Sequence, residues 1–223
     1  MINIAIDGHV SSGKSTLAKG VAKALGLKVL DTGAIYRGLA CAYKEGDFGE
    51  INKQNIEKFL KDIKVEVKFQ DKKQLVFVND KDYTPFLRLE EISNLSSSIS
   101  PYKNLREVVT KIQRTFAQEN NCIIEGRDIG TEILPNATIK LFVTASAEER
   151  ARRRFLQVKD TGTTFEKVLA DLKERDRKDE TRAVAPLKIA KDAIVVDTTN
   201  MNLDEAIAYS VGLIQQKINK NFA

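Results

Sequence analysis

The stretch Gly8-His9-Val10-Ser11-Ser12-Gly13-Lys14-Ser15 decides the fold class of this 223-residue chain. A short apolar run at residues 2–6 precedes it, and residues 14–25 follow with leucine and valine at helical spacing. Two glycines with four residues between them, followed by lysine and serine, form the pattern of a phosphate-binding loop when they lie between a strand and a helix. In such a loop the backbone N–H groups turn inward around phosphates, and the helix N-terminus adds a positive dipole.

Two side chains of the loop have separate tasks in binding a triphosphate. Lys14 is a point charge for the β and γ phosphates, and the Ser15 hydroxyl is a ligand for Mg²⁺. His9 is the only histidine; it occupies a variable position of the loop, where a structural role is favoured over a catalytic one. The expected nucleotide-binding residues are Gly8, His9, Val10, Ser11, Ser12, Gly13, Lys14, Ser15 and Thr16.

Outward from the loop, predicted strands alternate with predicted helices. Further strands are expected at 27–30, 122–125, 138–143 and 193–197. Helices are expected at 34–44, at 53–62, from Ser100-Pro101 to 119, from Ser146, and from about 202, with helices also flanking a loop at 159–164. Ser146 and Glu149 form a capping-box pattern. The alternation predicts an α/β fold with a doubly wound parallel sheet.

The alternation is interrupted between residues 62 and 98. Two β-rich runs at 65–69 and 75–78 are joined by the polar residues 70–73, which is a hairpin signal, and a third short strand is expected around 82–84. This region therefore predicts an insert with a small antiparallel sheet. The core on either side of it is expected to comprise residues 1–61 and 99–223.

Composition and charge narrow the classes of function. The chain is 42% hydrophobic and 30% charged, as expected for a soluble globular protein, and its apolar runs are too short to span a membrane. The N-terminal residues show no signal-peptide pattern, and Cys41 and Cys122 are expected to be buried reduced thiols, so we expect a cytoplasmic protein. The net charge is +5, but basic and acidic residues are mixed without a block of like charges, which favours a small polyanion over nucleic acid as partner.

Three polar segments are candidates for a second substrate site. Residues 31–37 and 125–131 each follow a predicted core strand, at the carboxyl edge where ligands gather in such sheets. Residues 175–182 carry three arginines between acidic residues, downstream of the arginine-rich run that begins at Arg150. Guanidinium groups suit phosphates, and carboxylates suit sugar hydroxyls. A guanine-reading Asn-Lys-x-Asp stretch is absent from the sequence, which argues against a regulatory GTPase.

Together these segments resemble the bacterial cytidylate kinase family. The resemblance rests on the loop, on Asp-Thr-Gly-Ala-Ile-Tyr-Arg at 31–37, on Gly-Arg-Asp-Ile-Gly-Thr at 126–131, on Glu-Glu-Arg-Ala-Arg-Arg-Arg at 148–154 and on Arg-Ala-Val-Ala-Pro-Leu at 182–187. It covers nearly the whole chain. Thr32 replaces a usual serine, Glu125 stands where the family often has aspartate, and the run ending at Arg182 differs at intervening positions.

The resemblance implies a P-loop kinase that phosphorylates CMP and dCMP with ATP and Mg²⁺, as part of pyrimidine nucleotide metabolism. It implies a lid at about residues 150–182 whose Arg153 and Arg154 close on ATP, and a monophosphate-binding role for the insert at 62–98. We expect a monomer that does not bind nucleic acid or membranes. The expected catalytic residues are Lys14, Arg127, Arg153, Arg154 and Arg182. The implied acceptor residues are Arg37, Arg127 and Arg182 for the phosphate, Ser97, Arg106 and Asp128 for the cytosine with Thr32 nearby, and Arg175 and Asp179 for the ribose.

Two other readings stay open on the sequence alone. A P-loop kinase with a hydroxyl acceptor would need a carboxylate base, for which Asp31 is the candidate. A basic nucleic-acid-binding NTPase would show turnover that RNA or DNA stimulates and that falls steeply with salt. A monophosphate acceptor needs no base, because its second pKa near 6 leaves roughly nine in ten molecules as the dianion at pH 7.

Overall fold

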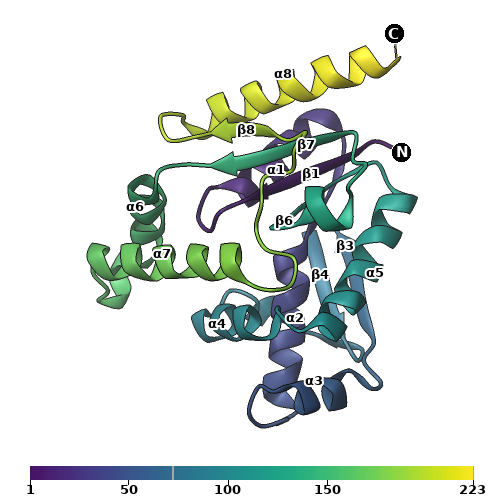
Figure 1. Cartoon of the computed structure of the whole chain (residues 1–223), viewed down its shortest axis with the longest axis vertical. Helices are drawn as coiled ribbons and strands as arrows, with labels where there is room; N and C mark the ends of the chain where they lie inside the picture. The colour runs from purple at the N-terminus through teal and green to yellow at the C-terminus, as the bar shows by residue number, and fades with distance from the viewer. Residues whose placement is uncertain (72, 223) are drawn as a thin grey trace. The chain divides into compact units, whose positions relative to one another are not determined.

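The computed structural model describes residues 1–71 and 73–222, and they form two compact units. The first unit comprises residues 1–29 and 117–223, and the second comprises residues 30–116. Figure 1 shows the elements of both, coloured along the chain. The expected insert at 62–98 lies inside the second unit, which also contains the helices on either side of the insert.

A parallel sheet with flanking helices is the centre of the first unit. Among the described residues, five strands lie in the order β2-β6-β1-β7-β8. Pairs β1–β6, β1–β7 and β7–β8 are parallel. The strands are β1 (Asn3–Gly8), β2 (Lys28–Asp31, which begins in this unit), β6 (Cys122–Gly126), β7 (Ile139–Thr144) and β8 (Ile194–Asp197). The central strands are mostly apolar and almost entirely buried, as expected for parallel strands covered on both sides.

Helices α1 (Lys14–Leu25) and α8 (Leu203–Phe222) cover one face of this sheet. Leu17 and Val21 of α1 and Ile214 of α8 join one apolar cluster with Ile4 and Ile6 of β1. The other side chains of β1 lie on the opposite face, where η2 (Ile129–Ile133) is hydrogen-bonded to Asp7. The expected doubly wound sheet is therefore confirmed.

Helices α6 (Ala147–Val158) and α7 (Phe165–Thr181) form a hairpin through a short turn, η3 (Lys159–Thr161). They share a small core of Ala151, Val168 and Leu172. The expected cap is present, since Ser146 accepts a hydrogen bond from the Glu149 backbone N–H. The second half of the capping box does not form, because the Ser146 N–H donates to Thr199 and the Glu149 carboxylate pairs with arginines instead.

The second unit combines helices with the expected antiparallel sheet. Strands β3 (Val65–Gln70), β4 (Lys73–Val78) and β5 (Lys81–Asp82) lie in sequence order. The helices are α2 (Thr32–Glu45), α3 (Lys53–Leu60), η1 (Thr84–Phe86), α4 (Glu90–Ile99) and α5 (Lys103–Glu119), the last of which extends into the first unit. Val76 and Val78 of β4 lie against Gly38 of α2, where an added β-carbon would collide with Val76.

One helix start was predicted wrongly. Ser100-Pro101 was expected to begin a helix, but both residues lie in a turn between α4 and α5. The Ser100 N–H still closes the end of α4 by donating to the Ser96 carbonyl, and α5 begins at Lys103. The dipeptide thus ends one helix instead of starting the next, because a proline fits a turn as well as a first helical position.

Candidate active site

The phosphate loop has the backbone geometry that its glycines require. Gly8 has a φ of 154°, and a β-carbon there would overlap the carbonyl oxygen of Val143. Gly13, with a φ of 83°, is the N-cap of α1, and its carbonyl accepts from the Leu17 N–H at 2.9 Å. Both positions need a residue without a side chain, because other residues adopt this φ only with strain. Lys14 extends back over the loop, its Nζ lying 3.5 Å from the His9 carbonyl oxygen.

A carboxylate stands beside the hydroxyl expected to bind Mg²⁺. The Ser15 Oγ donates to Oε2 of Glu125 at 2.6 Å, and Glu125 is buried near the end of β6. Strands β1 and β6 are neighbours, so the phosphate loop that follows β1 meets the end of β6 directly. A hydroxyl and a carboxylate at this distance supply the oxygen ligands that Mg²⁺ prefers.

Asp7 anchors the loop that carries Arg127 and Asp128. Its two carboxylate oxygens accept from the backbone N–H groups of Ile129 and Gly130 at 2.8 and 2.7 Å. Burial raises the pKa of Asp7 from 3.8 to about 6, against the two N–H donors, which act to lower it. This carboxylate therefore ties the end of β1 to the Gly-Arg-Asp-Ile-Gly segment after β6.

Alternating charges form a compact cluster beside this segment. The Arg127 Nε donates to Oδ2 of Asp179 at 2.8 Å. Arg182 lies 3.8 Å from the other Asp179 oxygen and 3.6 Å from Asp128. Burial acts to raise the pKa of Asp179, but the Arg127 guanidinium lowers it below its ordinary value, so the carboxylate is ionised at neutral pH. The structure thus brings together four residues from the two segments predicted at 125–131 and 175–182.

Three further arginines predicted for the site, Arg153, Arg154 and Arg175, lie on α6 and α7 and differ in their contacts. Arg175 is half-buried on α7, and its charge helps to lower the pKa of Asp179. Arg153 lies beside the loop, with one guanidinium nitrogen 3.8 Å from the position of a β-carbon on Gly13, and it donates to Thr198 at 3.0 Å and 2.7 Å. Arg154 is exposed and donates to Gln157, so no contact between it and the loop is present in this conformation of the described residues.

His9 is bound on both ring nitrogens by residues of the same unit. Its Nδ1 lies 3.2 Å from the Thr144 hydroxyl, and its Nε2 lies 3.0 Å from a carboxylate oxygen of Glu180 at the end of α7. The ring also packs edge-on against Phe142. Both ring nitrogens of His9 are therefore within hydrogen-bonding distance of protein groups, and its role at the loop stays a prediction.

In the second unit, the segment at 31–37 is held at its start. The Asp31 carboxylate caps α2 by accepting from the Ala34 N–H at 2.9 Å and binds Arg37 at 3.1 Å. The Gln74 side chain pairs with both backbone groups of Asp31, at 2.8 and 3.0 Å. Thr32 is buried at the first position of the helix. The Asp31 carboxylate is therefore engaged as a helix cap and as the ion-pair partner of Arg37.

Ser97 and Arg106 lie on consecutive helices of the second unit. The Ser97 hydroxyl donates to the Ser93 carbonyl within α4 at 3.1 Å. Arg106 is buried, donates to the Ser100 carbonyl at 3.3 Å, and lies 5.7 Å from the centre of the Tyr36 ring. Residues of α2, α4 and α5 are therefore associated within this unit, whereas Arg127, Asp128, Arg175, Asp179 and Arg182 belong to the first unit.

Several residues that build the site were not predicted from the sequence. Asp7 and Gln74 each hold the backbone of a segment that carries predicted ligands, and Arg150 and Asp176 hold the phosphate loop itself. Asp7 carried a signal, since a carboxylate at the end of an apolar strand is buried only with partners. Gln74 carried none, because its pairing depends on tertiary contact.

Other classes of site receive no support from the structure. Among residues 1–71 and 73–222, no group of three or more His, Cys, Asp or Glu side chains is arranged to hold a metal ion. Within those same ranges, no helix has the length and apolarity needed to span a membrane. Cys41 and Cys122 are free and buried, as expected.

The chain was compared with known proteins. The family model described as cytidylate kinase matches residues 4–216. The cytidylate kinase of Caldicellulosiruptor bescii is 40% identical over 99% of this chain and 98% of that protein. That of Caldicellulosiruptor saccharolyticus is 41% identical over 92% of each. A crystal structure of a gluconokinase from Sinorhizobium meliloti is 14% identical and superposes with a TM-score of 0.51 over 99% of this chain and 96% of that one, a likeness of fold alone.

Proposed function

The chain belongs to the cytidylate kinase family, and we propose that it transfers the γ-phosphoryl group of ATP to CMP, and also to dCMP, by in-line displacement. One observation carries the proposal beyond the family match. The phosphate loop follows β1, and Arg127 follows the neighbouring strand β6, where it meets Asp179 and Arg182 from the end of α7, all within one compact unit. A donor site and a site for a second anion are what phosphoryl transfer between two nucleotides requires.

The chemistry assigned to the acceptor agrees with the side chains present. A phosphate dianion attacks without a base, so catalysis consists of positioning and charge stabilisation. Asp31, the base candidate of a hydroxyl-acceptor kinase, caps α2 and pairs with Arg37. This supports a phosphate acceptor over a hydroxyl acceptor.

The residues around Ser15 fit a bound Mg²⁺ ion. We propose that the Ser15 hydroxyl and the Glu125 carboxylate hold it, because they are 2.6 Å apart, Ser15 in the first turn of α1 and Glu125 near the end of β6. When bound, the ion neutralises charge on the donor phosphates. Lys14 then holds the β and γ phosphates, and the N–H groups of residues 8–16 surround them.

The acceptor residues are assigned by the resemblance to the family, and the chemistry of their groups agrees with that assignment. Arg127 and Arg182 supply guanidinium forks for the monophosphate, and Asp179 and Arg175 lie beside them for the ribose. Asp128 can only accept, which suits the N4 amino group of cytosine. From the second unit we assign Arg37 to the phosphate, Ser97 and Arg106 to the base with Thr32 nearby, and the insert at 62–98 to monophosphate binding. Arg153 and Arg154 are assigned to a lid that closes on ATP.

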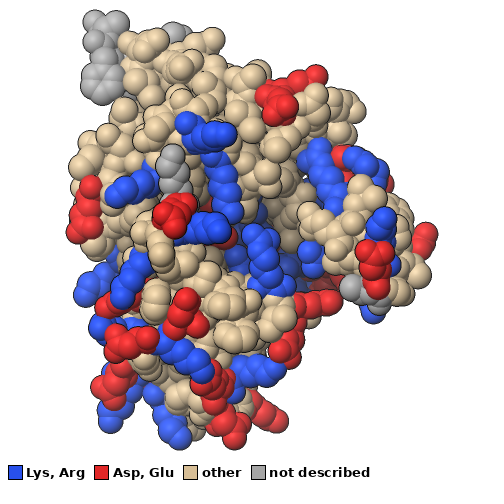
Figure 2. All heavy atoms as spheres, turned by 180° about the vertical axis from the view of Figure 1, so that it is seen from behind, with Lys and Arg blue, Asp and Glu red and all other residues tan. Residues whose placement is uncertain are grey.

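The partners are proposed to be ATP and CMP or dCMP alone, for a monomer in the cytoplasm. Figure 2 shows Lys and Arg side chains interspersed with Asp and Glu side chains on the face it draws. Mixed charges of this kind do not form the continuous basic track that a nucleic-acid backbone binds. Size-exclusion chromatography with light scattering tests the monomer.

A coupled assay of ADP release tests the function. We expect turnover with CMP and dCMP that requires Mg²⁺, and much slower turnover with UMP or AMP. Turnover that depends on RNA instead of CMP would support the nucleic-acid NTPase, and turnover with a small hydroxyl compound would support the hydroxyl-acceptor kinase. Either result would overturn the proposal.

A further inference from the structure

We propose that Arg150 and Asp176 are positioning residues that clamp the backbone of Val10 on both sides, so that the shape of the phosphate loop depends on the α6–α7 hairpin. The inference rests on the proposed function in that the loop is taken to bind ATP. Neither residue was assigned a role above in binding ATP, Mg²⁺ or the acceptor. Both are buried, with 6% and 7% of their surface exposed.

The clamp engages both polar backbone groups of Val10. Arg150 NH1 donates to the Val10 carbonyl at 3.1 Å, and the Val10 N–H donates to Oδ1 of Asp176 at 3.3 Å. The two side chains pair with each other at 2.5 Å, and the Arg150 Nε donates to the Ala145 carbonyl at 2.9 Å. The Val10 N–H belongs to the peptide that joins residues 9 and 10, and the Val10 C=O belongs to the peptide that joins residues 10 and 11. One ion pair therefore fixes the orientation of two consecutive peptide planes at the start of the loop.

The side chains of the loop are held by the same hairpin. Val10 packs against the apolar core that α6 and α7 share, which is formed by Ala151, Val168 and Leu172. The preceding residue, His9, contacts Glu180 on α7. Residues 9 and 10 are therefore held in place by contacts with the α6–α7 hairpin, through their side chains and through the Val10 backbone.

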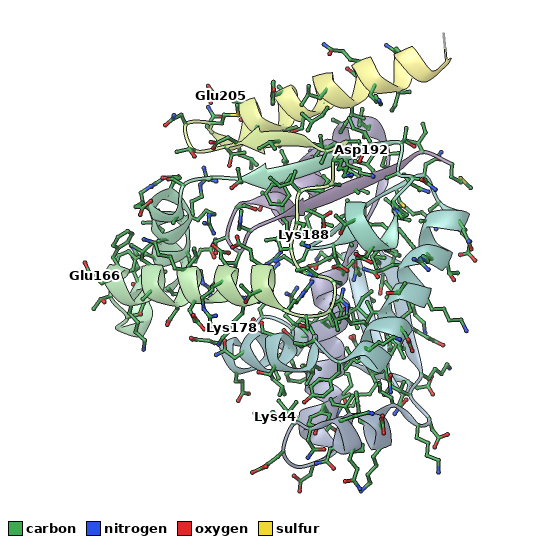
Figure 3. All side chains as sticks on the ribbon, in the orientation of Figure 1. Lys44, Glu166, Lys178, Lys188, Asp192 and Glu205 are labelled. Atoms are coloured by element: carbon green, nitrogen blue, oxygen red, sulfur yellow. The ribbon has the colours of Figure 1, made fainter. Side chains whose placement is uncertain are left out.

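The contacts lie at one end of the hairpin. Arg150 is in the first turn of α6, and Asp176 and Glu180 are in the last turns of α7. Figure 3 labels Glu166 near the start of α7 and Lys178 near its end, and the contacts lie on the Lys178 side. The eleven residues from 166 to 176 span roughly 15 Å of helix. The base of the expected lid is therefore fastened to the phosphate loop, while its tip at residues 158–165 is distant from the clamp.

The charges explain why an ion pair suits this position. A carboxylate next to a phosphate loop would repel the donor phosphates, but the Arg150 guanidinium neutralises it. Removing one partner would leave a buried charge and destabilise the fold, whereas an apolar pair of similar volume is often tolerated. A double substitution consequently separates positioning of the loop from stability.

The test compares Arg150→Met/Asp176→Leu with the wild-type chain. This double variant leaves the net charge unchanged, so the long-range attraction for ATP is unchanged. We expect a melting temperature within a few degrees of wild type, a Kd for a non-hydrolysable ATP analogue raised roughly tenfold, and an unaltered Kd for CMP. Hydrogen exchange of the peptide covering residues 8–15 should accelerate, because the Val10 N–H loses its acceptor.

The matched control is Glu174→Gln/Arg177→Gln, which removes an exposed ion pair from α7, the helix that carries Asp176. In the wild type, the Arg177 Nε lies 2.8 Å from a carboxylate oxygen of Glu174. We expect wild-type ATP affinity in this control. If the double variant does not fold, the ATP affinity of Arg150→Lys is measured instead. Lysine keeps the positive charge but cannot make the three hydrogen bonds of the Arg150 guanidinium, so we expect a severalfold weaker ATP affinity. Wild-type ATP affinity in either folded clamp variant overturns the inference. ATP binding without CMP phosphorylation in the wild type would instead overturn the proposed function and leave the clamp standing.

Discussion

Replacing Asp7 with asparagine tests how the acceptor loop is anchored. The Asp7 side chain is buried, with 5% of its surface exposed, and its two oxygens accept from the N–H groups of Ile129 and Gly130. Asparagine has nearly the same shape but offers one acceptor oxygen and an amide group that opposes the second N–H. It also cannot ionise, so the pH dependence that comes from Asp7 disappears in the variant.

The size of that pH dependence follows from the pKa. Burial raises the pKa of Asp7 to about 6 in the folded protein, from 3.8. Between these values the folded state holds a proton that the unfolded state has released, so the contribution of Asp7 to stability is greatest below pH 3.8 and is lost as pH rises through 6. At 1.36 kcal/mol per pKa unit, the rise from 3.8 to about 6 is worth ~3 kcal/mol.

The assay is urea unfolding, followed by circular dichroism, of the wild type and Asp7→Asn at intervals between pH 4 and pH 7. Other groups titrate equally in both proteins, so the difference between the two unfolding free energies isolates Asp7. We expect the wild type to lose most of this ~3 kcal/mol relative to the variant as the pH rises across that range. A constant difference would show that Asp7 titrates as an ordinary carboxyl, and the account of its burial would be refuted.

Three further substitutions test the proposed site by kinetics. Lys14→Ala should leave the fold intact and lower turnover about a hundredfold or more, since it removes charge stabilisation at the transferred phosphoryl group; wild-type turnover with ATP and CMP would contradict the loop assignment. Asp179→Ala should lower kcat/KM for both acceptors, because it also releases Arg127, but more for CMP than for dCMP, by roughly the 1.5–3 kcal/mol of a charged hydrogen bond; equal losses would mean that Asp179 does not bind the 2′-hydroxyl. Asp128→Asn should narrow the preference for CMP over UMP, because an amide can donate to O4 of uracil, and UMP turnover equal to that of CMP in the wild type would contradict the base assignment.

Local signals were sufficient for most of the secondary structure. The helix predicted at residues 14–25 is α1 within the same bounds, because an αL glycine at each end marks its limits. The hairpin predicted from 65–78 is confirmed as β3 and β4. Helix α4 was not predicted, and Ser100-Pro101 was read as a start although it lies after the end of that helix. A serine followed by proline can begin a helix or form the turn after one. Which of the two occurs depends on the tertiary packing around the dipeptide.

The sequence by itself determined the phosphate loop, because glycine spacing and positive φ angles are properties of the local backbone. It also determined that arginines and carboxylates would follow the strands, and the resemblance supplied their expected roles. Tertiary structure alone decided which charges meet: Arg127 with Asp179, 52 residues apart, and Arg150 with Asp176 around the backbone of Val10. The physical reason is that a buried charge needs a partner, and many residues in a sequence could provide one, but only the folded chain brings a particular pair within hydrogen-bonding distance.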